Sequence, residues 1–292
     1  MKSARIAIVA LLMMLPLTAQ SQLDGLPGNA YQALGSANAS MQEALTTYDA
    51  HFPDRPLWQE TFRHARRAIS LAPGHPEPVR FLAEAYSRAN WYGPAWNAWL
   101  DYLAQGHDLR AEDDRLFAEV GHQMGWSHYT AGELEEALSI YRTVIDVVPF
   151  DLEAYTWAGR ILLELERPEA AISYWQTVAD RNPEDARARY FVELARDQAE
   201  WGVQAATAFR EGVAFYEEGD MTRARERFAR ATSLNQRYPE AWAWLGRVAF
   251  ETSNYADART YYTRASDLEP GNQTYRYFRE EAGRRLEGAT GE

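Results

Sequence analysis

The sequence contains no cysteine, and Lys2 is its only lysine among 292 residues. No disulfide can form, so the folded state has to be held together by noncovalent packing alone. The absence of cysteine also excludes the lipid anchor that bacteria attach to that residue. Acidic residues outnumber basic ones, 42 against 30, which gives a formal net charge of −12. Such a chain is a poor candidate for binding nucleic acid or anionic lipid surfaces, because both require a positively charged face.

The sequence also lacks any recognisable catalytic or metal-binding constellation. Its six histidines are scattered, and no two of them have the spacing of a zinc-protease helix. We find no phosphate-binding glycine loop, no nucleophile elbow and no calcium-loop pattern. Acidic pairs such as Asp113-Asp114 and Glu280-Glu281 are typical of solvated helix faces. We therefore expect no enzymatic activity, no cofactor and no bound metal.

One long apolar run is present, and it lies near the N-terminus. Lys2 and Arg5 precede the segment "IAIVALLMMLPL", which small and polar residues follow. This order predicts a secretory signal peptide, residues 1–19, with cleavage after Ala19 and a second candidate site after Ser21. The run is too short for a good membrane span, although an uncleaved N-terminal anchor stays open as an alternative. We therefore expect an exported protein, periplasmic or extracellular, with no stable membrane insertion after cleavage.

A period of 34 residues organises most of the chain. Apolar residues recur at helical spacing, and each unit breaks once in its middle at a Gly, Asn or Ser. Each unit is therefore predicted to be a helix, a tight turn and a second helix. Six pairs of residues mark the period: Gly125 and Gly159, Ala137 and Ala171, Pro149 and Pro183, Gly212 and Gly246, Ala224 and Ala258, and Ala231 and Ala265.

The clearest unit is "PEAWAWLGRVAFETSNYADARTYYTRASDLEPGN", residues 239–272. Gly246 and Ala258 have almost no side chain, so the two helices can approach closely where they cross. Tyr262 fills the space beside that contact, and Pro270 ends the second helix. The unit resembles the tetratricopeptide repeat family, whose signature it carries at Trp242, Leu245, Gly246, Ala258, Tyr262, Ala265 and Pro270.

The resemblance implies an all-α fold, a right-handed superhelical solenoid of about six such units. Units one to four would occupy residues 42–185, and units five and six residues 205–272. Residues 20–41 are predicted to form a lead-in and the start of the first helix. Residues 186–204 lack the small-residue pattern and are predicted to be an extra linking helix. Residues 273–292 suit a capping helix and tail that cover the open apolar end of the stack.

The segment "WYGPAWNAWLDY", residues 91–102, concentrates aromatic side chains. The repeat register places Trp96 and Trp99 in the core and leaves Trp91 exposed in the turn. Tyr102 replaces the small residue that lets the next unit approach, and an insertion, "RAEDDRLF", follows at residues 110–117. We therefore expect the stack to be wedged or re-angled between the second and third units.

The resemblance also implies a binding site, because the first helices of such repeats line a concave groove that receives a peptide or an extended segment. Repeats that clamp a peptide's terminal carboxylate use lysine and asparagine there, whereas Glu84 and Trp126 stand at the asparagine positions, which argues against that docking mode. An alternative is a solvated inner wall, with the aromatic residues packed on neighbouring helices. The groove-facing residues carried over by register are Arg80, Glu84, Arg88, His122, Trp126, Tyr129, Arg160, Glu164, Tyr216, Arg247 and Phe250.

These observations favour a non-catalytic scaffold or adaptor of the cell envelope that binds a protein or peptide partner. Aromatic and arginine side chains in the groove are the usual anchors of protein interfaces. A second hypothesis is an envelope carbohydrate-binding protein, prompted by ten tryptophans, most of which fall at packing positions of the repeat. A third, a hydrolase, lacks a nucleophile or a metal set in this sequence.

Overall fold

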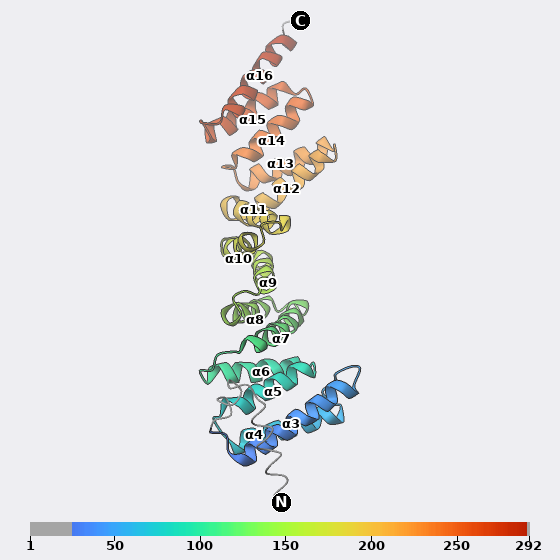
Figure 1. Cartoon of the computed structure of the whole chain (residues 1–292). Helices are drawn as coiled ribbons and strands as arrows, with labels where there is room; N and C mark the ends of the chain where they lie inside the picture. The colour runs from blue at the N-terminus through green and yellow to red at the C-terminus, as the bar shows by residue number, and fades with distance from the viewer. Residues whose placement is uncertain (1–24, 291–292) are drawn as a thin grey trace, which may run out of the picture. The chain divides into compact units, whose positions relative to one another are not determined.

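The computed structural model describes residues 25–290, which form a series of α-helices joined by turns, with no strand among them (Figure 1). The all-α fold predicted from the sequence is confirmed. The predicted signal peptide lies outside the described residues. No helix among residues 25–290 is long and apolar enough to cross a bilayer. The chain divides into two compact units, and the division falls between Ala154 and Tyr155 in the sequence.

Helices of the first unit follow one another as hairpins. Consecutive members pack together, α3 on α4, α5 on α6 and α7 on α8. Proline begins α4 and α5, where its missing N–H costs nothing. Residues 111–117 of the predicted insertion form the first two turns of α7. The helices are α3 (Gly28–Thr47), α4 (Pro56–Leu71), α5 (Pro76–Arg88), α6 (Tyr92–Ala104), α7 (Ala111–Thr130) and α8 (Leu134–Val147).

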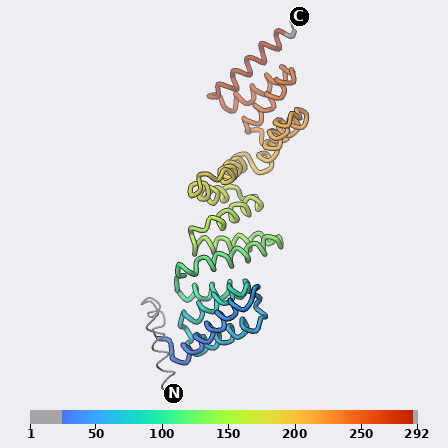
Figure 2. The backbone as a smooth tube through the Cα atoms, turned by 45° about the vertical axis from the view of Figure 1, so that its right-hand side comes forward, coloured from blue at the N-terminus to red at the C-terminus, as the bar shows by residue number. Residues whose placement is uncertain are grey.

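The second unit begins within α9 and continues to the end of the described chain. Figure 2 traces the backbone of the described residues from blue at the N-terminal end to red at the C-terminal end. Its helices also pack in sequence, α12 on α13, α14 on α15, and α16 on α15. They are α9 (Leu152–Glu164), α10 (Pro168–Arg181), α11 (Ala186–Trp201), α12 (Val203–Glu217), α13 (Met221–Leu234), α14 (Pro239–Glu251), α15 (Tyr255–Leu268) and α16 (Gln273–Thr290).

The predicted linking and capping segments both fold as helices. Helix α11 ends at Gly202, whose φ of 91° is in the left-handed region that glycine adopts at low cost. Trp201 then stacks on Tyr238, with ring centroids 4.7 Å apart. At the other end, Ala282 of α16 is fully buried in one core cluster with Ala249 and Ala258. Helix α16 therefore covers the apolar side of the last hairpin.

In four of the described hairpins a glycine of the first helix packs against an aromatic ring of the second. A Cβ added at Gly246 would lie 2.8 Å from Cδ2 of Tyr262, closer than real contacts allow. The same contact recurs in other hairpins, and its glycines and rings are among the residues that repeat every 34 positions. The other glycine and ring pairs are Gly125 with Tyr141, Gly159 with Trp175, and Gly212 with Phe228.

The aromatic segment of α6 is packed as predicted except at its first residue. Trp96 and Trp99 are buried, and the indole N–H of Trp99 donates to the Ser87 hydroxyl at 3.0 Å. Trp91 was expected to be exposed, and this is wrong: its ring is half-buried and lies 5.5 Å from that of Phe62. Phe62 of the preceding hairpin covers the Trp91 ring, and the position of Trp91 in a turn gives no sign of this contact. The expected re-angling of the stack stays a prediction.

Candidate functional site

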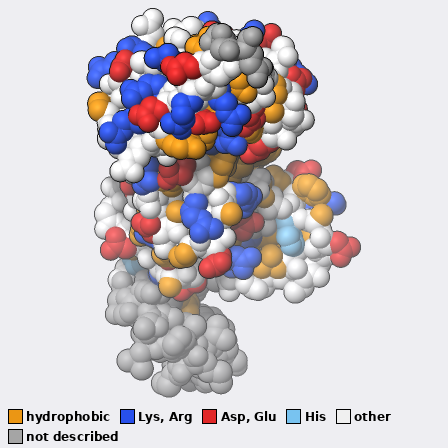
Figure 3. Space-filling view, turned by 90° about the horizontal axis from the view of Figure 1, so that it is seen from above, with side chains coloured by type: hydrophobic (Ala, Val, Ile, Leu, Met, Phe, Trp, Pro, Cys, Tyr) orange, Lys and Arg blue, Asp and Glu red, His pale blue; other side chains and the backbone are white. Residues whose placement is uncertain are grey.

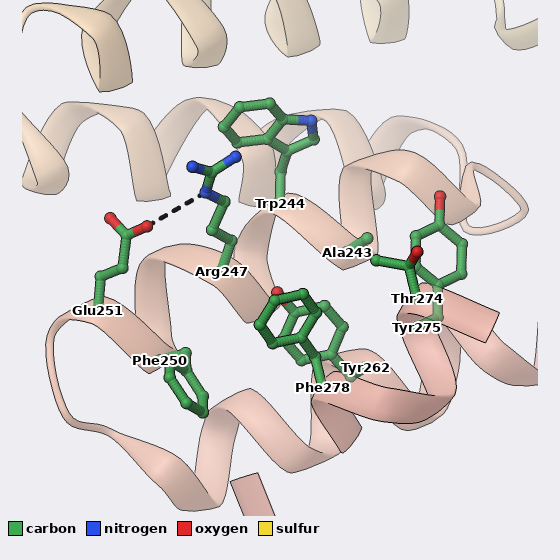
Figure 4. A pocket seen from close by; sticks show the side chains of 9 residues that line it. All are labelled: Ala243, Trp244, Arg247, Phe250, Glu251, Tyr262, Thr274, Tyr275 and Phe278. Carbon is green, nitrogen blue, oxygen red and sulfur yellow. Dashed lines mark hydrogen bonds and ion pairs between the residues drawn. The ribbon is translucent and has the colours of Figure 1, made fainter. Parts of the chain in front are cut away.

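An open pocket of about 410 Å³ lies in the second unit, between the last hairpin and the C-terminal helix (Figure 4). Helix α14 supplies one side of it, α15 the floor, and α16 the opposite side. Pockets that bind ligands in proteins generally have volumes of about 300–1,000 Å³. The lining residues are Ala243, Trp244, Arg247, Phe250 and Glu251 of α14, Tyr262 of α15, and Thr274, Tyr275 and Phe278 of α16.

Aromatic rings form the floor and one wall of the pocket. Tyr262 and Phe278 are stacked with centroids 5.4 Å apart, and Phe250 meets Phe278 edge-on at 6.0 Å. Burial, with a contribution from Glu269, raises the pKa of Tyr275 to about 12. Burial raises the pKa of Tyr262 as well. Both phenols therefore keep their protons at neutral pH, and the aromatic part of the pocket carries no charge.

The polar side of the pocket is built around Arg247. Its guanidinium carbon lies over two rings, 5.0 Å from the centroid of Trp244 and 4.8 Å from that of Tyr216 on α12. Its Nε donates to Oε1 of Glu251 at 3.1 Å, and the Tyr216 hydroxyl donates to the same oxygen at 2.6 Å. Burial alone would lower the pKa of Arg247, but Glu251 and Tyr216 outweigh it and raise that pKa. The guanidinium is therefore charged and held in one orientation.

Three predicted groove residues of the second unit come together here. Arg247 and Phe250 line the pocket, and Tyr216 supports Arg247 from α12. Arg160 and Glu164 are elsewhere, on α9, where they form an ion pair at 3.1 Å.

Most of the remaining pocket residues were not among those predicted from the sequence. Trp244 and Glu251 lie three residues before and four after Arg247, so helical spacing could have placed them on its face. Tyr275 and Phe278 carried no such signal, because α16 lies outside the repeat.

The predicted groove residues of α5 form an ion-pair network. Arg80 is only 12% exposed, and its guanidinium contacts Glu77 at 2.8 Å, Asp113 at 2.7 Å and Glu84 at 3.7 Å. Glu84 also accepts from Arg88 at 2.8 Å. The charges of Arg80 and Glu84 are therefore engaged within the protein, and Arg88 is the more exposed member of the three.

The predicted groove residues of α7 are divided between two settings. The Nε2 atom of His122 lies 3.1 Å from Oδ2 of Asp151, beside a second open pocket of about 540 Å³. Trp126 stacks on Tyr129 with centroids 5.7 Å apart, and its side chain is 48% exposed. All ten tryptophans lie in the described chain, and Trp126 is the one among them that is largely exposed. A carbohydrate platform of several tryptophans therefore finds no support.

The described surface carries charges of both signs and no cluster suited to a metal ion. Arginine and acidic side chains are interspersed on the face seen in Figure 3. Among residues 25–290, no group of three or more His, Cys, Asp or Glu side chains is arranged to hold a metal ion.

The hairpins and their closing contacts define an α-solenoid built from repeats. Sequence comparison matches the tetratricopeptide repeat family over residues 122–179, 158–192 and 209–272. The chain belongs to the tetratricopeptide repeat family. No curated protein matches it in sequence.

Several solved structures are similar to this chain. One is YrrB, described as a tetratricopeptide repeat protein with an unusual peptide-binding site. It is 17% identical to this chain over a match that covers 74% of this chain and 97% of YrrB, with a TM-score of 0.31. A tetratricopeptide repeat protein from Parabacteroides merdae has 13% identity over 85% of this chain and 99% of its own, with a TM-score of 0.37. PilF from Pseudomonas aeruginosa has 16% identity over 86% of this chain and 99% of its own, with a TM-score of 0.30.

Proposed function

We propose that this protein is an exported, non-catalytic adaptor of the cell envelope that binds a segment of another protein. Tetratricopeptide repeat proteins in general are scaffolds for protein–protein interaction, and this chain belongs to them. Export is supported by the basic, apolar and small residues of positions 1–19, and cleavage after Ala19 would release the mature chain.

The pocket on α14 is the observation that carries the binding role. It combines an arginine fixed against two rings with an apolar hollow, on the first helix of a repeat hairpin. Arginine and aromatic side chains dominate the energetics of protein interfaces, above all where they are held in place before binding. Trp126 on α7, which is exposed and stacks on the half-buried Tyr129, offers a second aromatic contact for the same purpose.

Affinity capture from the native envelope fraction tests the binding role. The mature chain is expected to retain one reproducible, near-stoichiometric protein, and a variant combining Trp126→Ala with Phe250→Ala should lose most of it. The matched control is Tyr190→Ala, which removes a ring that is 51% exposed on α11, outside the predicted groove. Equal capture by the groove variant and the control would refute binding through these first helices.

Export is tested separately, by the mass and location of the protein in its native cells. A mature chain that begins at Gln20 or Gln22 and fractionates with the envelope supports the proposal. A chain that retains Met1 and fractionates with the cytoplasm contradicts it.

A further inference from the structure

We infer that the pocket between α14, α15 and α16 binds an acidic side chain that is followed by an aromatic residue, within an extended peptide. This inference deepens the proposed function and rests on it. Arg247 would take the carboxylate, and the hollow lined by Phe250, Tyr262 and Phe278 would take the ring (Figure 4).

The carboxylate half follows from how Arg247 is held. Glu251 binds it through Nε, so both terminal amino groups lie outside that ion pair. These two groups form the planar, two-pronged donor that matches a carboxylate. The side chain of Arg247 is 51% exposed, so a ligand can reach it, while Trp244 and Tyr216 fix its plane. A guanidinium that is already ordered loses little entropy when it binds.

The aromatic half follows from the other walls of the pocket. Tyr262 and Phe278 stack nearly parallel, with an angle of 16° between their planes, and Phe250 stands edge-on to Phe278. A ligand ring can therefore meet both a ring edge and a ring face, the two favourable contacts between aromatic groups. Arg247 and Phe250 are three residues apart on α14, so the two halves lie on one face of that helix.

The C-terminal helix thereby acquires a role beyond covering the stack. Thr274, Tyr275 and Phe278 of α16 line the pocket opposite α14. Without α16 the hollow would lose one wall and open to solvent. The peptide chemistry is thus set jointly by a repeat helix and by a helix outside the repeat.

Peptide titration of the mature full chain tests this directly. The probes are eight-residue peptides, acetylated and amidated, with the sequence Gly-Gly-Ser-Asp-Phe-Ser-Gly-Gly or with Asn for Asp or Ala for Phe. Binding is followed by tryptophan fluorescence and by NMR shifts of the Trp244 indole. We expect each single change in the peptide to weaken binding at least tenfold.

Variants of the protein assign the two halves of the pocket. Arg247→Gln should remove the preference for Asp over Asn but keep the preference for Phe over Ala. Arg223→Gln is the matched control, because Arg223 also pairs with a carboxylate, that of Asp220, and lies over a ring, that of Phe215, outside the pocket. It should bind as the wild type does. Circular dichroism melting confirms that both variants are folded.

Three results would overturn the inference. They are equal binding of the Asp and Asn peptides, an Arg247→Gln variant that still discriminates between them, and binding only of a peptide with a free C-terminal carboxylate. Envelope capture separates this inference from the proposed function. If Arg247→Gln leaves envelope capture unchanged, the inferred role of the pocket is refuted and the adaptor function is retained. If the peptides bind but no envelope partner is captured, the adaptor function is refuted and the inferred role of the pocket is retained.

Discussion

The guanidinium of Arg80 on α5 donates through Nη1 to Oδ1 of Asp113 on α7 at 2.7 Å, and only 1% of the Asp113 side chain is exposed. Glu77 accepts from Arg80 at 2.8 Å and from Arg110 at 2.6 Å. Both Arg110 and Asp113 come from the inserted segment 110–117. The insertion therefore connects the second hairpin to the third through buried charges.

Arg80→Ala should destabilise the protein severely, because it leaves the buried carboxylate of Asp113 without its cation. Breaking a buried ion pair from one side costs about 3–5 kcal/mol in the free energy of unfolding. Urea denaturation measures this loss. Arg63→Ala is the control, since Arg63 pairs with Glu60 at 3.1 Å with both side chains exposed, and such pairs contribute about 0–1 kcal/mol. Similar losses in the two variants would show that the network on α5 and α7 is no stronger than a surface pair.

Gly246→Ala should lower the stability of the second unit by about 1–3 kcal/mol, the usual cost of overpacking. The added methyl group would lie 2.8 Å from Cδ2 of Tyr262 and would force the two helices of the hairpin apart. Gly283→Ala on α16 is the matched control, because its methyl group would meet Arg259 at an ordinary 3.8 Å. Alanine favours a helix over glycine by about 1 kcal/mol, so the control should be slightly more stable than the wild type. Thermal melts compare the two, and a harmless Gly246→Ala would contradict the close crossing.

The sequence predicted the features that repeat, because they are local and periodic. The contact of Gly246 with Tyr262 recurs in other hairpins, so spacing alone located it. The same register put Arg247 and Phe250 on one face of α14, and both line the pocket.

What the sequence did not predict depends on contacts outside the period. Arg80 fits a groove position by register, but it forms an ion pair with Asp113. Asp113 belongs to the insertion, which lies outside the repeat register. Phe278 belongs to a helix without the repeat signature, so its place in the pocket required the structure. Trp91 is similar, since Phe62 of the preceding hairpin covers it across an irregular turn.

The pair formed by His122 and Asp151 makes the stability of the first unit depend on pH. Burial disfavours the imidazolium, but the hydrogen bond to Asp151 outweighs this and raises the pKa of His122 above 6.5. Burial also opposes ionisation of Asp151, but the hydrogen bonds from His122 and from the Ala154 N–H lower its pKa below 3.8. The contribution of His122 is therefore complete below pH 6.5 and is lost as the pH rises through its raised pKa. That of Asp151 is present above pH 3.8 and is lost as the pH falls through its lowered pKa.

The pair should thus stabilise the fold most between pH 3.8 and pH 6.5. Urea denaturation of the wild type and of His122→Gln at about pH 5.5 and about pH 8.5 checks this, because the linkage acts on the difference between the two proteins. The wild type should exceed the variant by more at the lower pH. NMR titration of the His122 ring should give a midpoint above 6.5, the ordinary value. A difference in unfolding free energy that does not change with pH would mean that His122 contributes through packing alone, even if the variant is less stable throughout.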